Sequence, residues 1–168
     1  FRFFMWDGER GLGDRSGNST YTFDSTDRDW SYHATELHQD LSENPEYRIL
    51  FADHIQRALF NDGPLTAINS KARYNARADE IRPSLIAESA RWGDNRNPEM
   101  APYTRETWLA ESKRLADDFF PDRTAVVLAQ LVADGLYPAI PAPEFSQHGG
   151  EVPSGFVMDI AGAVPGGE

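Results

Sequence analysis

The sequence predicts a mainly α-helical protein with a short N-terminal strand and an extended C-terminal tail. Three observations support this fold class. Apolar residues recur at intervals of three and four positions through much of the region 45–134, which is the period of an amphipathic helix. Aromatic residues crowd the first seven positions without that period. Closely spaced prolines follow Tyr137 and disfavour helix there.

The N-terminal stretch, residues 1–7, is expected to form a short buried strand that leads into the glycine-rich stretch 8–17. The polar region 18–30 is expected to be an ordered loop held by isolated aromatic side chains. Because the chain opens inside an aromatic run and closes on a glycine-rich turn, we expect it to be an internal piece of a larger protein.

A first helix is predicted over residues 45–60. Asn44 can cap its start, and Pro45 suits the first helical position, where no backbone N–H is needed. The turn-forming residues 61–64 end it. Its predicted apolar face consists of residues spaced by three or four positions, namely Tyr47, Leu50, Phe51, His54, Ile55, Ala58 and Leu59.

A second helix is predicted within residues 79–92. Ile81, Leu85 and Trp92 have helical spacing, and Gly93 ends the pattern. Pro83 either begins this helix or kinks it, because proline lacks the backbone N–H and restricts the residue before it.

Two further helices are predicted over residues 104–119 and 121–134. Thr104 can cap the first, Pro121 opens the second and Gly135 closes it. Since only a short joint separates these two helices, they are expected to pack against each other. The predicted helices then form a bundle that buries four large side chains: Trp92, Trp108, Phe119 and Leu131.

The expected organisation is one domain, residues 1–137, followed by a tail, residues 138–168. A length of 168 residues and a hydrophobic fraction of 40% suffice for one ordinary core. Prolines at 138, 141 and 143 exclude helix and central strand, so the tail is expected to be extended or to link to a following domain.

The composition excludes several partners and chemistries. The sequence has 16 basic and 27 acidic residues, and its net charge of −11 repels phosphate backbones, so we expect no nucleic-acid partner. It has no cysteine, which excludes disulfides, Cys-ligated zinc and thiol nucleophiles. It has no apolar run of membrane-spanning length and no targeting signal, so we expect no membrane insertion.

Asp7 and Glu9 are the candidate metal ligands. Residues two apart in an extended chain share a face, so both carboxylates can point to the same place. Such oxygen ligands suit Mg²⁺ or Mn²⁺ that bridges nucleotide phosphates, and Gly8 allows another group to approach the backbone closely. The alternative is a solvated acidic turn after a buried strand, because Asp-x-Glu is a common pattern.

Other motifs favour structural interpretations. The glycines within 11–17 lack the spacing of a phosphate-binding loop, and no helix follows them. The aspartates within 24–29 suggest a calcium-stabilised module as a minor hypothesis, although the glycine and bidentate glutamate of an EF-hand loop are missing. His33 and His38 are five positions apart, which does not place both on one helical face for zinc.

Several phrases between residue 44 and about residue 155 resemble the C-terminal region of CotH-like (spore coat protein H) kinases, which occur in large multidomain bacterial proteins. The phrases are residues 44–53, 59–63, 86–94, 135–138 and 146–150. In that family a Trp-Asp-x-Asp or Trp-Asp-x-Glu motif precedes the helical region, and Trp6, Asp7 and Glu9 match it. Two departures are Leu12-Gly13, where an aromatic-glycine pair is common, and Pro83 within a helix.

The resemblance implies that this chain is the helical lobe of an atypical protein-kinase-like domain. It implies transfer of phosphate from ATP, with Mg²⁺ or Mn²⁺, to Ser or Thr of a protein substrate. Asp7 would bind the cofactor, and Asp7 and Glu9 would hold the metal. The nucleotide-clamping lysine and the catalytic-loop aspartate would precede Phe1, so the isolated chain is expected to be inactive.

The resemblance also implies a secreted or cell-surface location, with the protein substrate and adjoining domains of the parent chain as partners. Glu88 and Arg91, within one of the phrases, are expected to serve in packing or in a structural ion pair. The alternative function is a non-catalytic structural or interaction module of a secreted or cell-surface multidomain protein.

Overall fold

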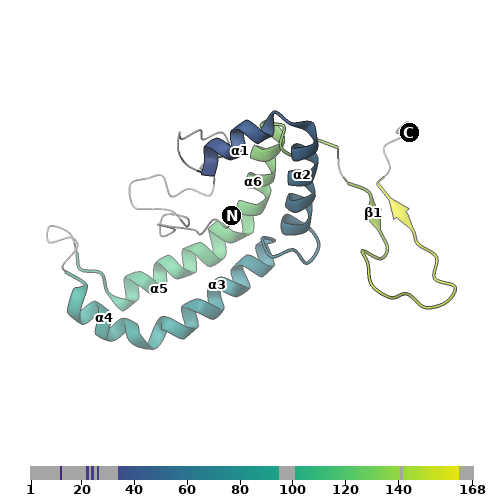
Figure 1. The fold of residues 1–168 in the computed structure, drawn as a ribbon. Helices are drawn as coiled ribbons and strands as arrows, with labels where there is room; N and C mark the ends of the chain where they lie inside the picture. Colours follow the sequence, from purple (N-terminus) through teal and green to yellow (C-terminus); the bar gives the residue numbers. More distant parts are fainter. Residues whose placement is uncertain are drawn as a thin grey trace. The chain divides into compact units, whose positions relative to one another are not determined.

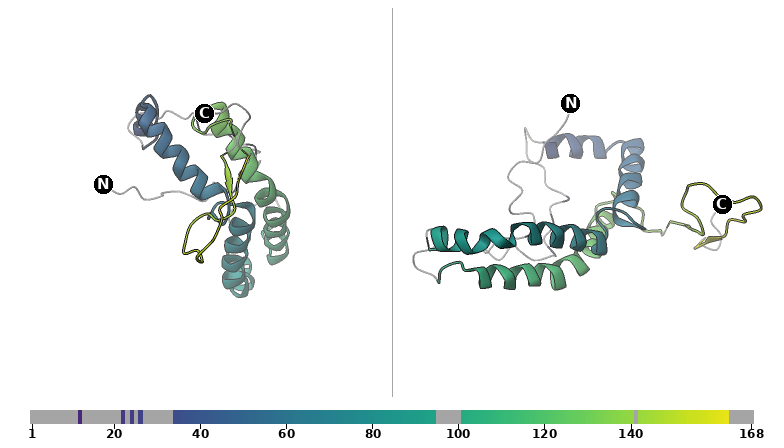
Figure 2. Two further views of the ribbon diagram at one scale, coloured as in Figure 1. Left: turned by 90° about the vertical axis from the view of Figure 1, so that its right-hand side faces the viewer. Right: turned by 90° about the horizontal axis from the view of Figure 1, so that it is seen from below.

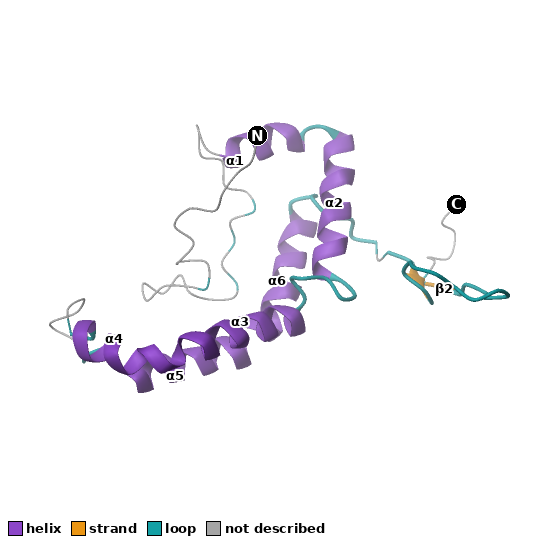
Figure 3. Cartoon of the chain, turned by 60° about the horizontal axis from the view of Figure 1, so that its bottom comes forward, coloured by secondary structure: helices purple, strands orange, loops and turns teal. Residues whose placement is uncertain are grey.

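The fold is described from a computed structural model, which divides the chain into two compact units, Phe1–Tyr137 and Pro138–Glu168. The described residues are 12, 22, 24, 26, 34–94, 101–140 and 142–162. Within them the protein is mainly helical, which confirms the prediction of a mainly α-helical fold (Figure 3). The predicted N-terminal strand, residues 1–7, lies outside them.

The first two helices among the described residues are α1, Ala34–Ser42, and α2, Pro45–Leu59. Asn44 caps α2 as predicted. Its side-chain Oδ1 accepts hydrogen bonds from the backbone N–H groups of Glu46, at 2.9 Å, and Tyr47, at 3.4 Å. The sequence pattern does not predict α1, because so short a segment with few apolar residues shows no clear helical stripe.

The next helix, α3, spans Ala67–Ile81 and continues through the 3₁₀ turn η2, Arg82–Ser84, into α4, Leu85–Trp92. The backbone is right-handed helical on both sides of the turn. Pro83 therefore kinks a helical run instead of beginning a helix. The sequence pattern does not predict most of α3, which is rich in alanine and polar residues and has no continuous apolar stripe.

The two predicted C-terminal helices are parts of a single helical run. It consists of α5, Arg105–Arg114, the π-helical turn η3, Leu115–Phe119, and α6, Phe120–Ala133. No reversal of the chain separates α5 from α6, so the prediction that these helices pack side by side is wrong. Instead, α3 packs along η3 and α6, and α4 packs on α5 (Figures 1 and 2).

Pro121 accounts for the π turn. Because proline has no backbone N–H, it cannot bond to the carbonyl of Asp117 four residues earlier. The preceding residue, Phe120, donates its N–H to the carbonyl of Leu115, five residues earlier, as a π turn requires. The helical run passes through the proline.

The run ends at Gly135, as predicted, in a Schellman motif. Gly135 has a φ of +69°, which glycine adopts without steric cost. Its N–H donates to the carbonyl of Val132 at 3.1 Å, and the N–H of Leu136 donates to the carbonyl of Leu131 at 2.8 Å. The buried Leu131 and Leu136 also belong to one apolar cluster, so the cap and the core stabilise the same turn.

Two apolar clusters form the core of the first unit. The cluster between α2 and α6 is built on the buried residues Leu59, Leu131 and Leu136. The cluster between α3 and the long helical run consists of Leu115, Phe119 and Phe120 with the partly buried Tyr74. The ring centroids of Tyr74 and Phe120 are 5.2 Å apart. The middle of the run and its C-terminal part are thus covered by different helices.

The predicted burial is confirmed for Phe119 and Leu131, which are 6% and 4% exposed. Trp108 is only half-buried. Trp92 is 47% exposed, so its predicted burial is wrong. This residue ends α4, and the guanidinium carbon of Arg91 lies 5.0 Å from the centroid of its ring.

The apolar face of α2 is narrower than predicted. Phe51, Ile55 and Leu59 contribute to the core, but Leu50 is 55% exposed and His54 is exposed. The core of the first unit therefore covers only one edge of the predicted stripe.

The second unit contains a small antiparallel pair of strands, β1, Glu144–Phe145, and β2, Ile160–Ala161. Beyond this pair, the N–H of Ser146 donates to the carbonyl of Asp159 at 2.9 Å. None of the residues described in this unit is helical or buried.

The core assignment predicts different effects for two Leu→Ala substitutions. Leu131→Ala removes a buried side chain and leaves a cavity, so we expect it to lower the free energy of unfolding by about 2–5 kcal/mol. Leu50→Ala, at a mostly exposed position of α2, should cost about 0.5 kcal/mol or less. Urea unfolding followed by circular dichroism measures both. Equal effects of the two substitutions would contradict this core.

Candidate functional site

The predicted metal ligands, Asp7 and Glu9, lie outside the described residues. The metal site therefore stays a prediction from the sequence. Within residues 34–94, 101–140 and 142–162, no three histidine, aspartate or glutamate side chains come together as a metal-binding group.

Asp24 belongs to a local turn. Its Oδ1 accepts hydrogen bonds from the backbone N–H of Thr26, at 3.1 Å, and from the hydroxyl of Thr26, at 2.7 Å. The same hydroxyl contacts the carboxylate of Asp134, after the last residue of α6, and the Thr26 carbonyl accepts a hydrogen bond from Gln39 of α1 at 3.1 Å. This turn connects α1 with the end of α6. The neighbouring aspartates at 27 and 29 are not among the described residues.

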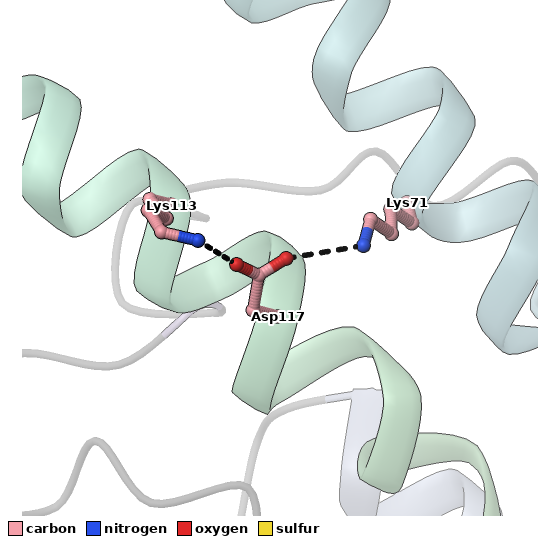
Figure 4. Close-up of polar contacts among 3 residues, drawn as sticks. All are labelled: Lys71, Lys113 and Asp117. Carbon is pink, nitrogen blue, oxygen red and sulfur yellow. Dashed lines mark hydrogen bonds and ion pairs between the residues drawn. The ribbon is translucent and has the colours of Figure 1, made fainter.

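A charged cluster formed by Lys71, Lys113 and Asp117 lies where α3 meets the π turn (Figure 4). The Lys71 Nζ lies 3.2 Å from Oδ1 of Asp117. The Lys113 Nζ donates to the other carboxylate oxygen, Oδ2. Lys113 is four residues before Asp117 on the same helical run, whereas Lys71 reaches across from α3. The cluster therefore connects two packed elements.

A second polar contact lies one turn further along α3. The hydroxyl of Tyr74 is 3.1 Å from the hydroxyl oxygen of Ser112 on α5. Since the ring of Tyr74 also packs on Phe120, this side chain contributes an apolar and a polar contact to the same interface.

The electrostatics of the charged cluster point to a structural role. Hydrogen bonds from Lys113 and then Lys71 hold the pKa of Asp117 below its usual value, and the same bond raises the pKa of Lys113. With each oxygen bonded to an ammonium group, this carboxylate has reduced basicity. The side chains are 40% to 79% exposed, so solvent and salt weaken these ion pairs.

Of the phrases that carry the CotH-like resemblance, residues 44–53 and 86–94 lie largely within α2 and α4, and the others lie at turns and in the second unit. Glu88 and Arg91 make no ion pair within the part of the chain that the structure describes, so the expected structural ion pair is not formed there. Arg91 instead lies over the ring of Trp92.

Lys71 and Tyr74 were not candidate residues in the sequence, because the helix that carries them was not predicted. A weak signal for that helix exists. Thr66 is a good N-cap residue, and neither glycine nor proline occurs in the fifteen residues that follow it, Ala67–Ile81.

Comparisons with protein-family models, with curated proteins and with solved structures give no match to this chain. The resemblance to CotH-like kinases therefore depends on the sequence phrases. Among the described helices, none combines the length and the apolar character needed to cross a membrane.

The charged cluster predicts a salt-dependent contribution to stability. Asp117→Asn removes the charge that pairs with both lysines, so it should lower the urea midpoint at low salt, and the difference should shrink in concentrated NaCl. The control is Asp53→Asn, which changes an exposed carboxylate of α2 and should leave the midpoint nearly unchanged. Equal midpoints for the two variants at low salt would show that the cluster does not stabilise the fold.

Proposed function

We propose that this chain is the C-terminal helical portion of a CotH-like, ATP-dependent protein kinase that transfers phosphate to Ser or Thr of a protein substrate. In this proposal the described helices are a framework, and the chain alone is inactive. The metal corner is formed by Asp7 and Glu9, at the exit of the predicted strand.

The observation that supports the proposal is that residues in the phrases similar to CotH-like kinases have specific structural roles. Asn44 caps α2, and Gly135 adopts the positive φ of the Schellman motif. A Cβ on Gly63 would lie 2.5 Å from the carbonyl oxygens of Arg57 and Ala58. Side chains other than hydrogen are therefore excluded there without a backbone shift.

Gly93, in another of the phrases, is equally constrained. A Cβ at this position would lie 2.4 Å from the carbonyl oxygen of Tyr103 and 2.5 Å from that of Ser89. The backbone N–H of Tyr103 also donates to the Gly93 carbonyl at 2.8 Å. Phrases that specify turns this closely are informative about the architecture of this chain, and the proposal is based on the resemblance that such phrases carry.

The donor set at the proposed metal corner fits the ion that the proposal requires. Two carboxylates are hard oxygen ligands, which Mg²⁺ and Mn²⁺ prefer, and the remaining ligands of such an ion normally come from water and nucleotide phosphates. When bound, the ion supplies positive charge that neutralises the phosphates. In this chain Asp7 and Glu9 would hold and orient it.

The second candidate function is a non-catalytic structural or interaction module. It is favoured by the fact that, in the part of the chain that the structure describes, the family-like residues serve caps and turns and the charged cluster joins helices. Both candidates place the parent protein outside the cell or on its surface, with adjoining domains as partners.

Transfer of radiolabelled phosphate from ATP tests the proposal. The samples are a protein carrying this chain together with the nucleotide-binding part, its Asp7→Asn variant, a matched Asp40→Asn variant and the present chain alone, each with Mg²⁺ or Mn²⁺. We expect transfer by the first protein and by Asp40→Asn, because Asp40 is exposed on α1. Asp7→Asn should abolish transfer because it removes a metal ligand, and the chain alone should show none.

Each departure from this pattern has a distinct meaning. Undiminished transfer by Asp7→Asn would refute the metal corner. Transfer by the chain alone would refute the need for a preceding half. An inactive but folded longer protein, with both metals tried, would favour the structural module.

A further inference from the structure

A histidine lies at the contact between α1 and α2. His38 of α1 packs its imidazole on Phe51 of α2, with ring centroids 4.9 Å apart, and on Tyr47, at 5.8 Å. Its Nδ1 is 2.8 Å from the hydroxyl oxygen of Tyr47. All three side chains are half-buried. A titratable ring thus provides both the apolar and the polar contact between these helices.

The apolar side chains of α1 contribute little to its docking. The helix has nine residues, which is too short to be stable by itself in water. Its large apolar side chains, Leu37 and Leu41, are 49% and 38% exposed. Gln39 adds one hydrogen bond, to the carbonyl of Thr26. The imidazole of His38 therefore supplies much of the apolar contact that α1 makes with α2.

Protonation changes what this imidazole can do. The neutral ring can accept a hydrogen bond from the Tyr47 hydroxyl at Nδ1. The imidazolium can only donate at both nitrogens, and it carries a charge into a half-buried aromatic contact. Burial lowers the pKa of His38 below its ordinary value of 6.5, because the charged form is less well solvated there.

The charged groups around His38 do not offset the lowering of its pKa by burial. On α2, Glu46, Arg48 and His54 are exposed, and on α1 Glu36 and Asp40 flank the next turns without contributing to the shift. The lowered pKa of His38 is therefore due to its burial.

We propose that α1 is an acid-releasable element: protonation of His38 frees α1 from α2 and uncovers Tyr47 and Phe51. A histidine whose pKa is lower in the docked state stabilises docking fully above its undocked pKa. That stabilisation is lost as the pH falls from 6.5 through the docked-state value. Phe51 packs against the cluster of Leu59, Leu131 and Leu136, so release would expose the outer face of a side chain that covers that cluster.

Amide hydrogen exchange of the full chain, measured between about pH 7.5 and about pH 5, tests the proposal. Rates are corrected for the intrinsic pH dependence and compared with amides of α6 in the same sample. The protection of the second half of α1 should be constant above about pH 6.5 and should fall below it. The fall is at most tenfold per pH unit, the limit for one proton, and the protection of α6 should not follow it.

Two variants make the result specific. His38→Phe keeps a ring against Phe51 but cannot titrate, so the protection of α1 should lose its pH dependence. His54→Gln removes an exposed histidine of α2 and should behave like the unmodified protein. If His38→Phe fails to dock α1, an NMR titration of the His38 ring in the unmodified protein decides, with a pKa below 6.5 expected.

Constant protection of α1 across this pH range would overturn the proposal. So would the same pH-dependent loss in a docked His38→Phe variant, or a His38 pKa at or above that of an unfolded chain.

Discussion

The long helical run of α5, η3 and α6 has its buried apolar side chains in η3 and α6, and the burial of this part is the constraint that organises the first unit. Because the run passes through Pro121 without reversing, its two halves cannot cover each other. The middle of the run, around Phe119, needs α3, and its C-terminal part, around Leu131, needs α2. The charged cluster and the Tyr74–Ser112 contact add polar contacts between α3 and the run. The position of this interface is determined mainly by apolar burial.

The turns determine which helix can reach which half of this run. Gly63 lets the chain pass close to the last turn of α2, and the hydroxyl of Thr124 on α6 donates to the carbonyl of Leu65 in the loop that follows, at 2.8 Å. At the C-terminal end of α6, Phe60 stacks on Tyr137, which directly follows the Schellman motif, and their ring centroids are 5.8 Å apart. Short sequence phrases at these turns therefore determine how the helices are arranged. The proposed kinase chemistry depends instead on residues that precede these helices.

Prediction from the sequence succeeded where local chemistry decides the outcome. The cap at Asn44, the stop at Gly135 and the burial of Leu131 follow from residue type and spacing. It failed for α3, whose stability comes from packing instead of a stripe of its own, and for the joint at Pro121, where a π turn replaced the expected break. The charged cluster was not predictable, because it forms only when α3 is in place. Asp7 and Glu9 remain predictions.

A distance measurement tests the continuous helical run most directly. The chain has no cysteine, so Ala110→Cys and Ala129→Cys, at exposed positions of α5 and α6, give a unique pair of spin-label sites. A continuous helix rises about 1.5 Å per residue, which predicts a backbone separation of about 28 Å by pulsed electron paramagnetic resonance. Helices that fold back on each other at Pro121 would bring the two backbones to about 10 Å, and such a distance would contradict this account.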